Sequence, residues 1–313
     1  MSDNARILIA YDGSDAAEAA LNDLPRAGLS RNAKALIVSV QERWLPPPSS
    51  YEIVEEVLNA SEPSGQKPAR AKEEPEIQIA QAESPRLGKA EKRLASYFPD
   101  WKIDTLSLQG SPSYQILWKA NEWDANLIVV GSQGNAGTRL FSLGSVSQKI
   151  ANEARCSVRV VRGNSWKKGA PTRILVGLDG TRAAQSAIEE IGRRMWLMGS
   201  EVRLVTAKDP SHDKRKASDE SDKIDAWINA FIEEAKELLK QSDLNVSQIV
   251  EQGDPKQLIC RAAEEWGADC IFIGSNDTGS SYEDLLLGSV ATAVVARAHC
   301  TVEIVRHQNL SLK

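Results

Sequence analysis

The sequence has few of the residues that carry redox or metal chemistry. It contains four cysteines and three histidines in 313 residues, and no two cysteines form a C-x-x-C pair. Buried, inert thiols in a reducing compartment are the simplest interpretation of these cysteines. The histidines share no spacing typical of a metal site. The composition therefore disfavours disulfide frameworks and metal centres.

The chain also lacks a basic excess and a long apolar run. Lys and Arg number 38 against 43 Asp and Glu, giving a net charge of −5, which disfavours binding to a nucleic-acid backbone. No apolar stretch approaches the ~20 residues that a membrane span needs, and the N-terminus lacks a signal-peptide pattern. We therefore expect a cytoplasmic protein without a nucleic-acid or membrane partner.

What the sequence does have is an internal repeat. The block Ile7–Ser14 recurs at Ile174–Thr181, an offset of 167 residues, and the block Trp123–Ser132 recurs at Trp266–Ser275, an offset of 143. The offset falls by 24, so the first half carries about two dozen extra residues. They lie in a stretch rich in Pro, Ser, Glu and Lys at about 44–85, whose composition predicts an exposed, partly disordered insertion.

Each repeat predicts one domain of alternating strands and helices, at 1–163 and 171–307. Strands are expected at Arg6–Tyr11, Ala35–Val40, Lys102–Gln109, Leu127–Gly131 and Val158–Val161, and again at Arg173–Leu178, Glu201–Ala207, Val246–Gln252, Cys270–Gly274 and Val302–Val305. Helices are expected at Asp15–Gly28, Ser84–Tyr97, Tyr114–Trp123 and Ser145–Ala154, and again at Arg182–Leu197, Asp219–Gln241, Pro255–Trp266 and Ser289–Ala298. Short apolar strands separated by helices predict an α/β fold with five-stranded parallel sheets covered on both faces.

The most specific motif is a glycine pattern in the first half. The apolar run Leu127–Val130 leads into Gly131–Gly134, and Gly144-Ser145 follows nine residues later and opens a helix. Glycines allow backbone N–H groups to approach an anion, and a helix N-terminus adds unpaired donors and a favourable dipole. The spacing is neither that of a Walker A loop nor that of G-x-G-x-x-G. It indicates a phosphate cradle, and hence a nucleotide.

These motifs together resemble the ATP-binding class of universal stress proteins. The resemblance rests on Asp12-Gly13-Ser14 at a strand end, the Gly110-x-Pro112 turn and the pattern from Gly131 to Ser145. The repeat extends it to a tandem member over nearly the whole chain. It implies two Rossmann-like domains of the adenine nucleotide alpha hydrolase-like type. It also implies that Val158–Val161 and Val302–Val305 pair within the chain as a pseudo-dimer, and that two chains form a homodimer.

The resemblance further implies a ligand, ATP with Mg²⁺ or Mn²⁺, and the residues that hold it. Ala10 and Asp12 would contact ribose and base, and Val40 would pack on the adenine. The phosphates would be held, mostly by backbone N–H groups, at Gly131, Gly134, Gly144, Ser145 and Val146, with a side-chain contact from Ser147. Basic residues are common in the family's glycine loop, whereas this loop has Gln133 and Asn135, so Arg139 is the nearest cation.

Each of these residues also has a purely structural interpretation. Asp12 is a candidate N-cap for the helix near Asp15, and Ser145 is a candidate N-cap for its own helix. Gly131 and Gly134 are candidate turn residues. The tryptophans on helix faces are expected in the core rather than against a ligand; they are Trp118, Trp123, Trp227 and Trp266.

The second half carries a degraded form of the cradle. Its equivalent positions are Asp179, Gly274, Gly288 and Ser289, with one residue inserted between the end glycines. Asp277 replaces the second glycine, which brings a carboxylate toward the phosphates and is unfavourable. Ala207 stands where the first half has Val40 and would offer a smaller apolar surface to the adenine. We expect this half to bind ATP more weakly than the first half, or not at all.

The leading hypothesis is an ATP-binding stress-response regulator with at most weak ATPase activity. No Walker B acid follows the cradle, and no residue is an obvious general base for water. The alternative is a protein-interaction scaffold with a vestigial site and an unidentified protein partner. An adenylyl transferase is disfavoured because H-x-G-H and K-M-S-K-S signatures are missing. A redox role would require Cys156 and Cys300 to pair.

Overall fold

The computed structural model describes residues 5–42, 85–133, 143–163, 169–208, 218–275 and 287–306. The first half contains β1 (Ala5–Ala10), α1 (Asp15–Asp23), the 3-10 helix η1 (Leu24–Arg26), β2 (Ala33–Gln41), α3 (Pro85–Tyr97), β3 (Lys102–Gln109), α4 (Pro112–Glu122), β4 (Leu127–Gly131), α5 (Ser145–Glu153) and β5 (Ser157–Val161). The second contains β6 (Arg173–Leu178), α6 (Arg182–Gly192), β7 (Glu201–Lys208), α7 (Ser218–Lys240), β8 (Asn245–Gln252), α8 (Pro255–Trp266), β9 (Cys270–Ser275), α9 (Ser289–Arg297) and β10 (Thr301–Arg306). Apart from Pro85, the insertion expected at about 44–85 lies outside the described residues.

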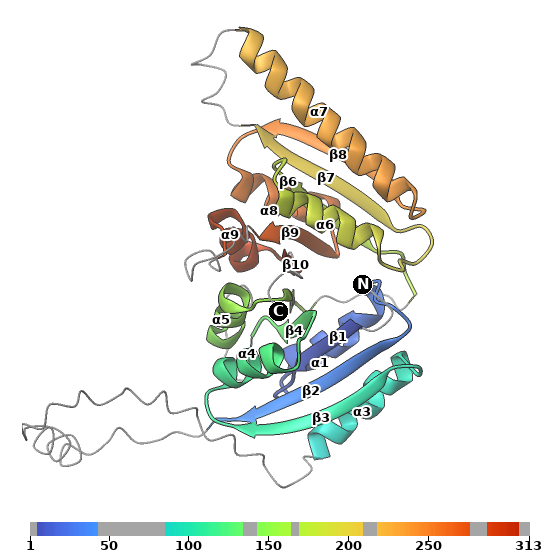
Figure 1. The fold of residues 1–313 in the computed structure, drawn as a ribbon, viewed down its shortest axis with the longest axis vertical. Coiled ribbons are helices and arrows are strands. Elements are labelled where there is room, and N and C mark those ends of the chain that lie inside the picture. Colours follow the sequence, from blue (N-terminus) through green and yellow to red (C-terminus); the bar gives the residue numbers. More distant parts are fainter. Residues whose placement is uncertain are drawn as a thin grey trace, which may run out of the picture.

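The described strands form one ten-stranded sheet in the order β3-β2-β1-β4-β5-β10-β9-β6-β7-β8 (Figure 1). All pairs within each half are parallel, as expected. β5 and β10 pair antiparallel at the centre, which confirms that the last strands of the two halves join within the chain. We call this β5–β10 junction the seam. The strand order of each half reverses at β1/β4 and at β6/β9, where ligands of open α/β sheets bind.

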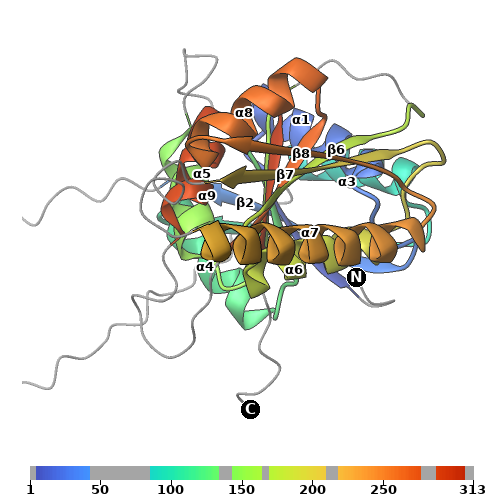
Figure 2. The ribbon, with the colours of Figure 1, turned by 90° about the horizontal axis from the view of Figure 1, so that it is seen from above.

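Helices cover both faces of the sheet, and one of the cores spans both halves. In the second half, α8 lies on one side of β7 and β8 while α6 and α7 lie on the other (Figure 2). Apolar residues from α4 and α5 join those from α8 and α9 in a single buried cluster. On the opposite face, the residues from α1 and α3 form one cluster and those from α6 and α7 form another. On the face covered by α4, α5, α8 and α9, the core therefore continues from one half of the chain into the other.

Two helices end earlier than the sequence suggested. The helix expected to reach Gly28 ends at Asp23, because Pro25 lacks a backbone N–H and the chain continues as η1. The helix expected to reach Leu197 ends at Gly192. Beyond it the chain turns toward the first half, where the guanidinium of Arg194 donates to the Ala27 carbonyl at 2.9 Å. Contacts with the other half thus override the local helical pattern.

A buried ionic network crosses the seam. The Arg159 guanidinium on β5 donates to the carboxylates of Asp23 (2.6 Å) and Glu303 (2.8 Å). The Arg194 guanidinium also donates to Glu303, through both of its terminal nitrogens. Burial would raise the pKa of Glu303, but the charges of Arg194 and Arg159 outweigh burial and lower that pKa. Glu303 therefore stays ionised in the interior.

Acid should weaken this seam through Glu303. A carboxyl whose pKa is lower in the folded state contributes stability above its unfolded pKa, about 4.3, and loses it as the pH falls through the folded pKa. We expect the contribution of Glu303 to be complete at neutral pH and to decline below about pH 4. The free energy of unfolding, measured in urea at several pH values, should fall less steeply toward acidic pH in Glu303→Gln than in the wild type. An equally steep fall in both proteins would contradict the assignment.

Candidate functional site

The residues predicted to hold the nucleotide in the first half lie at the switch point of its sheet, which is the place between β1 and β4 where the strand order reverses. Ala10 ends β1 and Gly131 ends β4, and the two strands are neighbours in the sheet. Val40 lies near the end of β2, on the other side of β1. Parallel strands end at the same edge, so these residues share one edge with Asp12. Gly134 and Arg139 lie outside the described residues.

Asp12 shapes the turn after β1 but does not cap α1. Its carboxylate accepts the Ser14 backbone N–H at 2.9 Å. The cap is Ser14 itself, whose hydroxyl accepts the Ala17 N–H at 3.2 Å. The capping interpretation of Asp12 is therefore wrong. Gly13, with φ +77°, supplies the left-handed conformation that lets the exposed Asp12 stand beside the strand end.

Helix α5 begins at a glycine N-cap. This N-cap is Gly144, not Ser145, so the N-cap residue has no side chain that could accept a hydrogen bond from the first turn, and no other described residue caps it. The Gly144 N–H is itself used, since it donates to the Ser132 carbonyl at 2.7 Å. Helices α1, α6 and α8, by contrast, are each capped by a side chain. The first N–H groups of α5 therefore suit an external anion.

Two predicted phosphate-binding residues also have structural partners. The buried Ser147 hydroxyl donates to the Gly131 carbonyl at 2.6 Å, which ties the first turn of α5 to the end of β4. A Cβ on Gly131 would lie 2.6 Å from the Ala16 carbonyl carbon and oxygen. Gly131 thus allows α1 to approach β4 closely, and any side chain there would disturb the fold as well as a ligand.

Sequence reasoning missed the side chains that cover the two Asp-Gly turns. In the first half, the Arg86 side chain of α3 lies over Gly13, with its Cδ 3.3 Å from where a Cβ would be. In the second half, the Trp227 ring of α7 lies over Gly180. Trp227 is 53% exposed, so its assignment to the core is wrong. The sequence offered little to find them by: Arg86 lies near the start of a predicted helix, and Trp227 lies in the first half of another.

The second half keeps a hollow at the equivalent place. A cavity of about 310 Å³ lies at the β6/β9 switch point. Its lining includes all of the residues predicted for this half: Asp179, Gly274, Gly288 and Ser289, together with Ala207. Helix α9, like α5, begins at a glycine N-cap without a side-chain cap. Asp277, which replaces the second glycine, lies outside the described residues, and the described ends of the changed pattern line this cavity.

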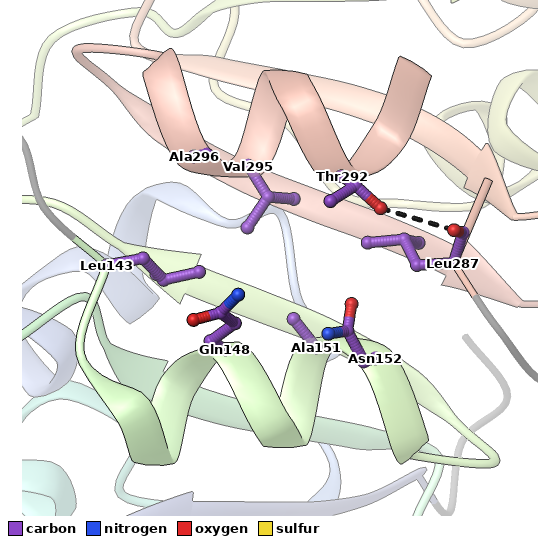
Figure 3. Close-up of a pocket in the computed structure, with 8 residues that line it drawn as sticks. All are labelled: Leu143, Gln148, Ala151, Asn152, Leu287, Thr292, Val295 and Ala296. Atoms are coloured by element: carbon purple, nitrogen blue, oxygen red, sulfur yellow. Dashed lines mark hydrogen bonds between the residues drawn. The ribbon is translucent and has the colours of Figure 1, made fainter. Parts of the chain in front are cut away.

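A groove of about 250 Å³ separates α5 from α9 on the seam (Figure 3). Its lining consists of repeat-equivalent positions: Leu143, Gln148, Ala151 and Asn152 from the first half and Leu287, Thr292, Val295 and Ala296 from the second. The Thr292 hydroxyl donates to the Leu287 carbonyl at 3.2 Å. The first half contributes two amides, whereas the second contributes mostly apolar groups.

The cysteines fit the inert interpretation. Cys156, Cys270 and Cys300 are buried and all four thiols are free. Burial raises the pKa of Cys156 and of Cys270 to about 12, so little thiolate forms at neutral pH. Within the described residues, no group of three or more His, Cys, Asp or Glu is placed to hold a metal ion. No helix in that part of the chain is long and apolar enough to span a bilayer.

Comparison with known proteins identifies both halves. The model of the universal stress protein family matches residues 4–162 and 171–306. Universal stress protein YxiE of Bacillus subtilis is 29% identical over 165 residues, which cover 50% of this chain and 98% of that protein. A universal stress protein of Thermus aquaticus is 34% identical over 159 residues, covering 50% and 97%.

A solved structure supports the arrangement of the whole chain. The crystal structure of a universal stress protein from Archaeoglobus fulgidus superposes with a TM-score of 0.64 at 18% identity. The match covers 96% of this chain and 98% of that one. At this identity the likeness concerns the fold alone.

Proposed function

The chain belongs to the universal stress protein family, as a tandem of two such domains, and we propose that it is a stress-response regulator that binds ATP in its first domain. In this proposal ATP acts as a ligand that stabilises or switches the protein, and hydrolysis is at most slow. The second domain binds ATP more weakly or not at all.

The observation that carries the proposal is the start of α5 at a glycine N-cap, beside the place between β1 and β4 where the strand order reverses. Backbone N–H groups of Ser145, Val146 and Ser147 begin this helix, and a helix N-terminus attracts phosphate through its free donors and its dipole. The exposed Asp12 at the end of β1 is placed to accept hydrogen bonds from a ribose or base. Val40 supplies an apolar surface at the same edge.

Arg86 adds a second cation to Arg139 of the glycine loop. Its guanidinium lies beside the Gly13 turn, next to the edge where the triphosphate would bind. The second domain has the uncharged Trp227 at the corresponding turn. This difference favours the polyanion in the first domain, in addition to the acidic Asp277 of the second half. A divalent cation, Mg²⁺ or Mn²⁺, would accompany the nucleotide.

A matched pair of substitutions tests which domain binds. Gly144→Asp places a carboxylate at the N-cap of α5, where φ −67° and ψ 152° accept any residue. Aspartate is a favourable N-cap, so the fold should hold while the carboxylate takes the donors meant for phosphate. Gly288→Asp makes the same change at α9, where a Cβ meets nothing within 4 Å. Nucleotide released from freshly purified protein is then quantified by mass spectrometry, and Mg-ATP binding by calorimetry.

We expect about one ATP or ADP per wild-type chain, at least a hundredfold weaker binding in Gly144→Asp, and nearly unchanged binding in Gly288→Asp. The reverse pattern would place the site in the second domain. Two nucleotides per chain would contradict the predicted weakness of the second site. Wild-type protein that releases no nucleotide and binds no Mg-ATP would favour the scaffold hypothesis.

A further inference from the structure

The seam has approximate twofold symmetry, and its axis passes through one residue pair. In the antiparallel register of β5 and β10, Glu303 stands opposite Arg159. Glu303 follows Arg159 by 144 positions, the same interval by which Cys300 follows Cys156. Each residue at the axis therefore faces its own repeat equivalent. If two identical first domains were joined in this way, residue 159 would meet its own copy.

The two side chains at this axis carry opposite charges and are shielded from water. Arg159 donates to the Glu303 carboxylate at 2.8 Å, and the side chains are 1% and 0% exposed. Two arginines at this position would hold like charges in contact where solvent screens them little. Two glutamates would do the same with the opposite sign.

Further charges alternate in sign on either side of the axis. Asp23 in α1 pairs with Arg159 at 2.6 Å. On the other side, Arg194 pairs with Glu303 and donates to Glu190 in α6 at 3.0 Å. Glu190 is the repeat equivalent of Asp23, at the offset of 167. The sequence of charges is thus negative, positive, negative, positive, negative, and it continues without a break only when the two domains differ.

We propose that this network makes the seam selective for unlike domains: the first domain accepts the second and rejects another copy of itself. Each assembled pair then contains one intact and one altered glycine cradle. Because the selectivity resides in Arg159 and Glu303, this inference is independent of whether ATP binds.

One pair of contacts at the seam does not discriminate in this way, because it is the same in both directions. Arg162 of the first domain donates to the Val295 carbonyl of α9 at 2.6 Å. Its repeat equivalent, Arg306, donates to the Ala151 carbonyl of α5 at 2.8 Å. A pair of identical domains could form these bonds equally well. These two bonds strengthen the seam without selecting a partner, whereas the charge pair at the axis does select, and the ion pair between Arg26 and Asp269 adds a second contact that runs in one direction only.

The experiment uses two full-length variants, Arg159→Glu and Glu303→Arg. The first has glutamate on both sides of its axis and the second has arginine on both sides, so neither can close a native seam within one chain. Mixed together, the Arg159 domain of the Glu303→Arg chain meets the Glu303 domain of the Arg159→Glu chain, which restores the native network at one of the two inter-chain seams. At the other seam the two charges of the axial pair are exchanged, so they still attract each other. One variant is labelled with ¹⁵N, and native mass spectrometry measures the species.

We expect the amount of the mixed dimer to exceed the mean amount of the two homodimers by about tenfold or more. Wild-type chains mixed with labelled wild-type chains should stay monomeric with respect to this contact. Arg193→Glu, which changes the exposed Arg193 by the same charge, serves as the control and should give no mixed species. A statistical distribution of dimers, or two closed monomers as stable as the wild type, would overturn the proposal.

If either variant alone is insoluble, the two chains are produced together in the same cells with different tags. The proposal expects soluble protein in which one tag retrieves the other in equal amount. Insolubility of both chains when produced together would overturn it, because the native network is then available and yet does not form.

Discussion

Replacing Glu303 by alanine is expected to lower the free energy of unfolding by about 3 kcal/mol, since removal of one partner leaves buried charges without their counterpart. Glu303 is fully buried and accepts from Arg159 and Arg194. Both arginines keep a second carboxylate, Asp23 and Glu190 respectively, which places the loss at the lower end of the range for broken buried pairs. Urea unfolding of the full chain measures it.

The matched control is Glu189→Ala on helix α6. Glu189 pairs with Arg193 at 2.7 Å one helical turn away, and both side chains are partly exposed to solvent. Such a pair contributes no more than about 0.5 kcal/mol. Equal losses in Glu303→Ala and Glu189→Ala would show that the buried network adds little to stability, and would also weaken the argument that it selects the partner domain.

The sequence predicted the architecture well because the repeat marked the same elements twice. β3, β4, β6 and α8 begin and end at the expected residues. The last strands were expected to pair within the chain from the family resemblance, and they do. Local pattern suffices where apolar strands stop at glycine or where a helix starts at proline, as α8 does at Pro255.

The seam was harder to anticipate because its signal is spread over distant residues. Arg159 and Glu303 are charged residues inside otherwise apolar strands, at equivalent repeat positions and with opposite sign. The sequence shows this combination, but it indicates an ion pair only when the register of β5 and β10 is known to place the two side chains together. The early end of α6 has the same origin, because Arg194 leaves the helix to reach Glu303.

The phosphate cradle could be predicted only in part, for a different reason. The sequence located Asp12, Gly131 and Gly144 at the correct strand and helix ends. It did not show that Gly144 rather than Ser145 is the N-cap, or that the Ser147 hydroxyl bonds to the Gly131 carbonyl. One glycine pattern is compatible with several hydrogen-bond arrangements, so assigning donors requires coordinates.

The second large effect is expected from adding a single methyl group at the end of β9. In Gly274→Ala, the new Cβ would lie 2.2 Å from the carbonyl carbon and oxygen of Ala183 at the start of α6. These are backbone atoms, so the strain can be relieved only by moving α6 away from the sheet. Overpacking a well-packed interior costs about 1–3 kcal/mol and occasionally more. We expect a loss of about 3 kcal/mol in urea unfolding.

Gly131→Ala makes the same change in the first domain, where the Cβ would lie 2.6 Å from the equivalent carbonyl group of Ala16. The contact is less severe, so the loss should be smaller than for Gly274→Ala. Gly88→Ala on α3 is the opposite control: its Cβ meets nothing within 4 Å, and alanine in a helix should add about 0.5–1 kcal/mol. If Gly131→Ala and Gly274→Ala are as stable as the wild type, close helix approach is not why glycine stands there. A purely ligand-binding role for Gly131 would then be favoured, because glycine would be needed there for the close approach of an anion and not for the close approach of α1.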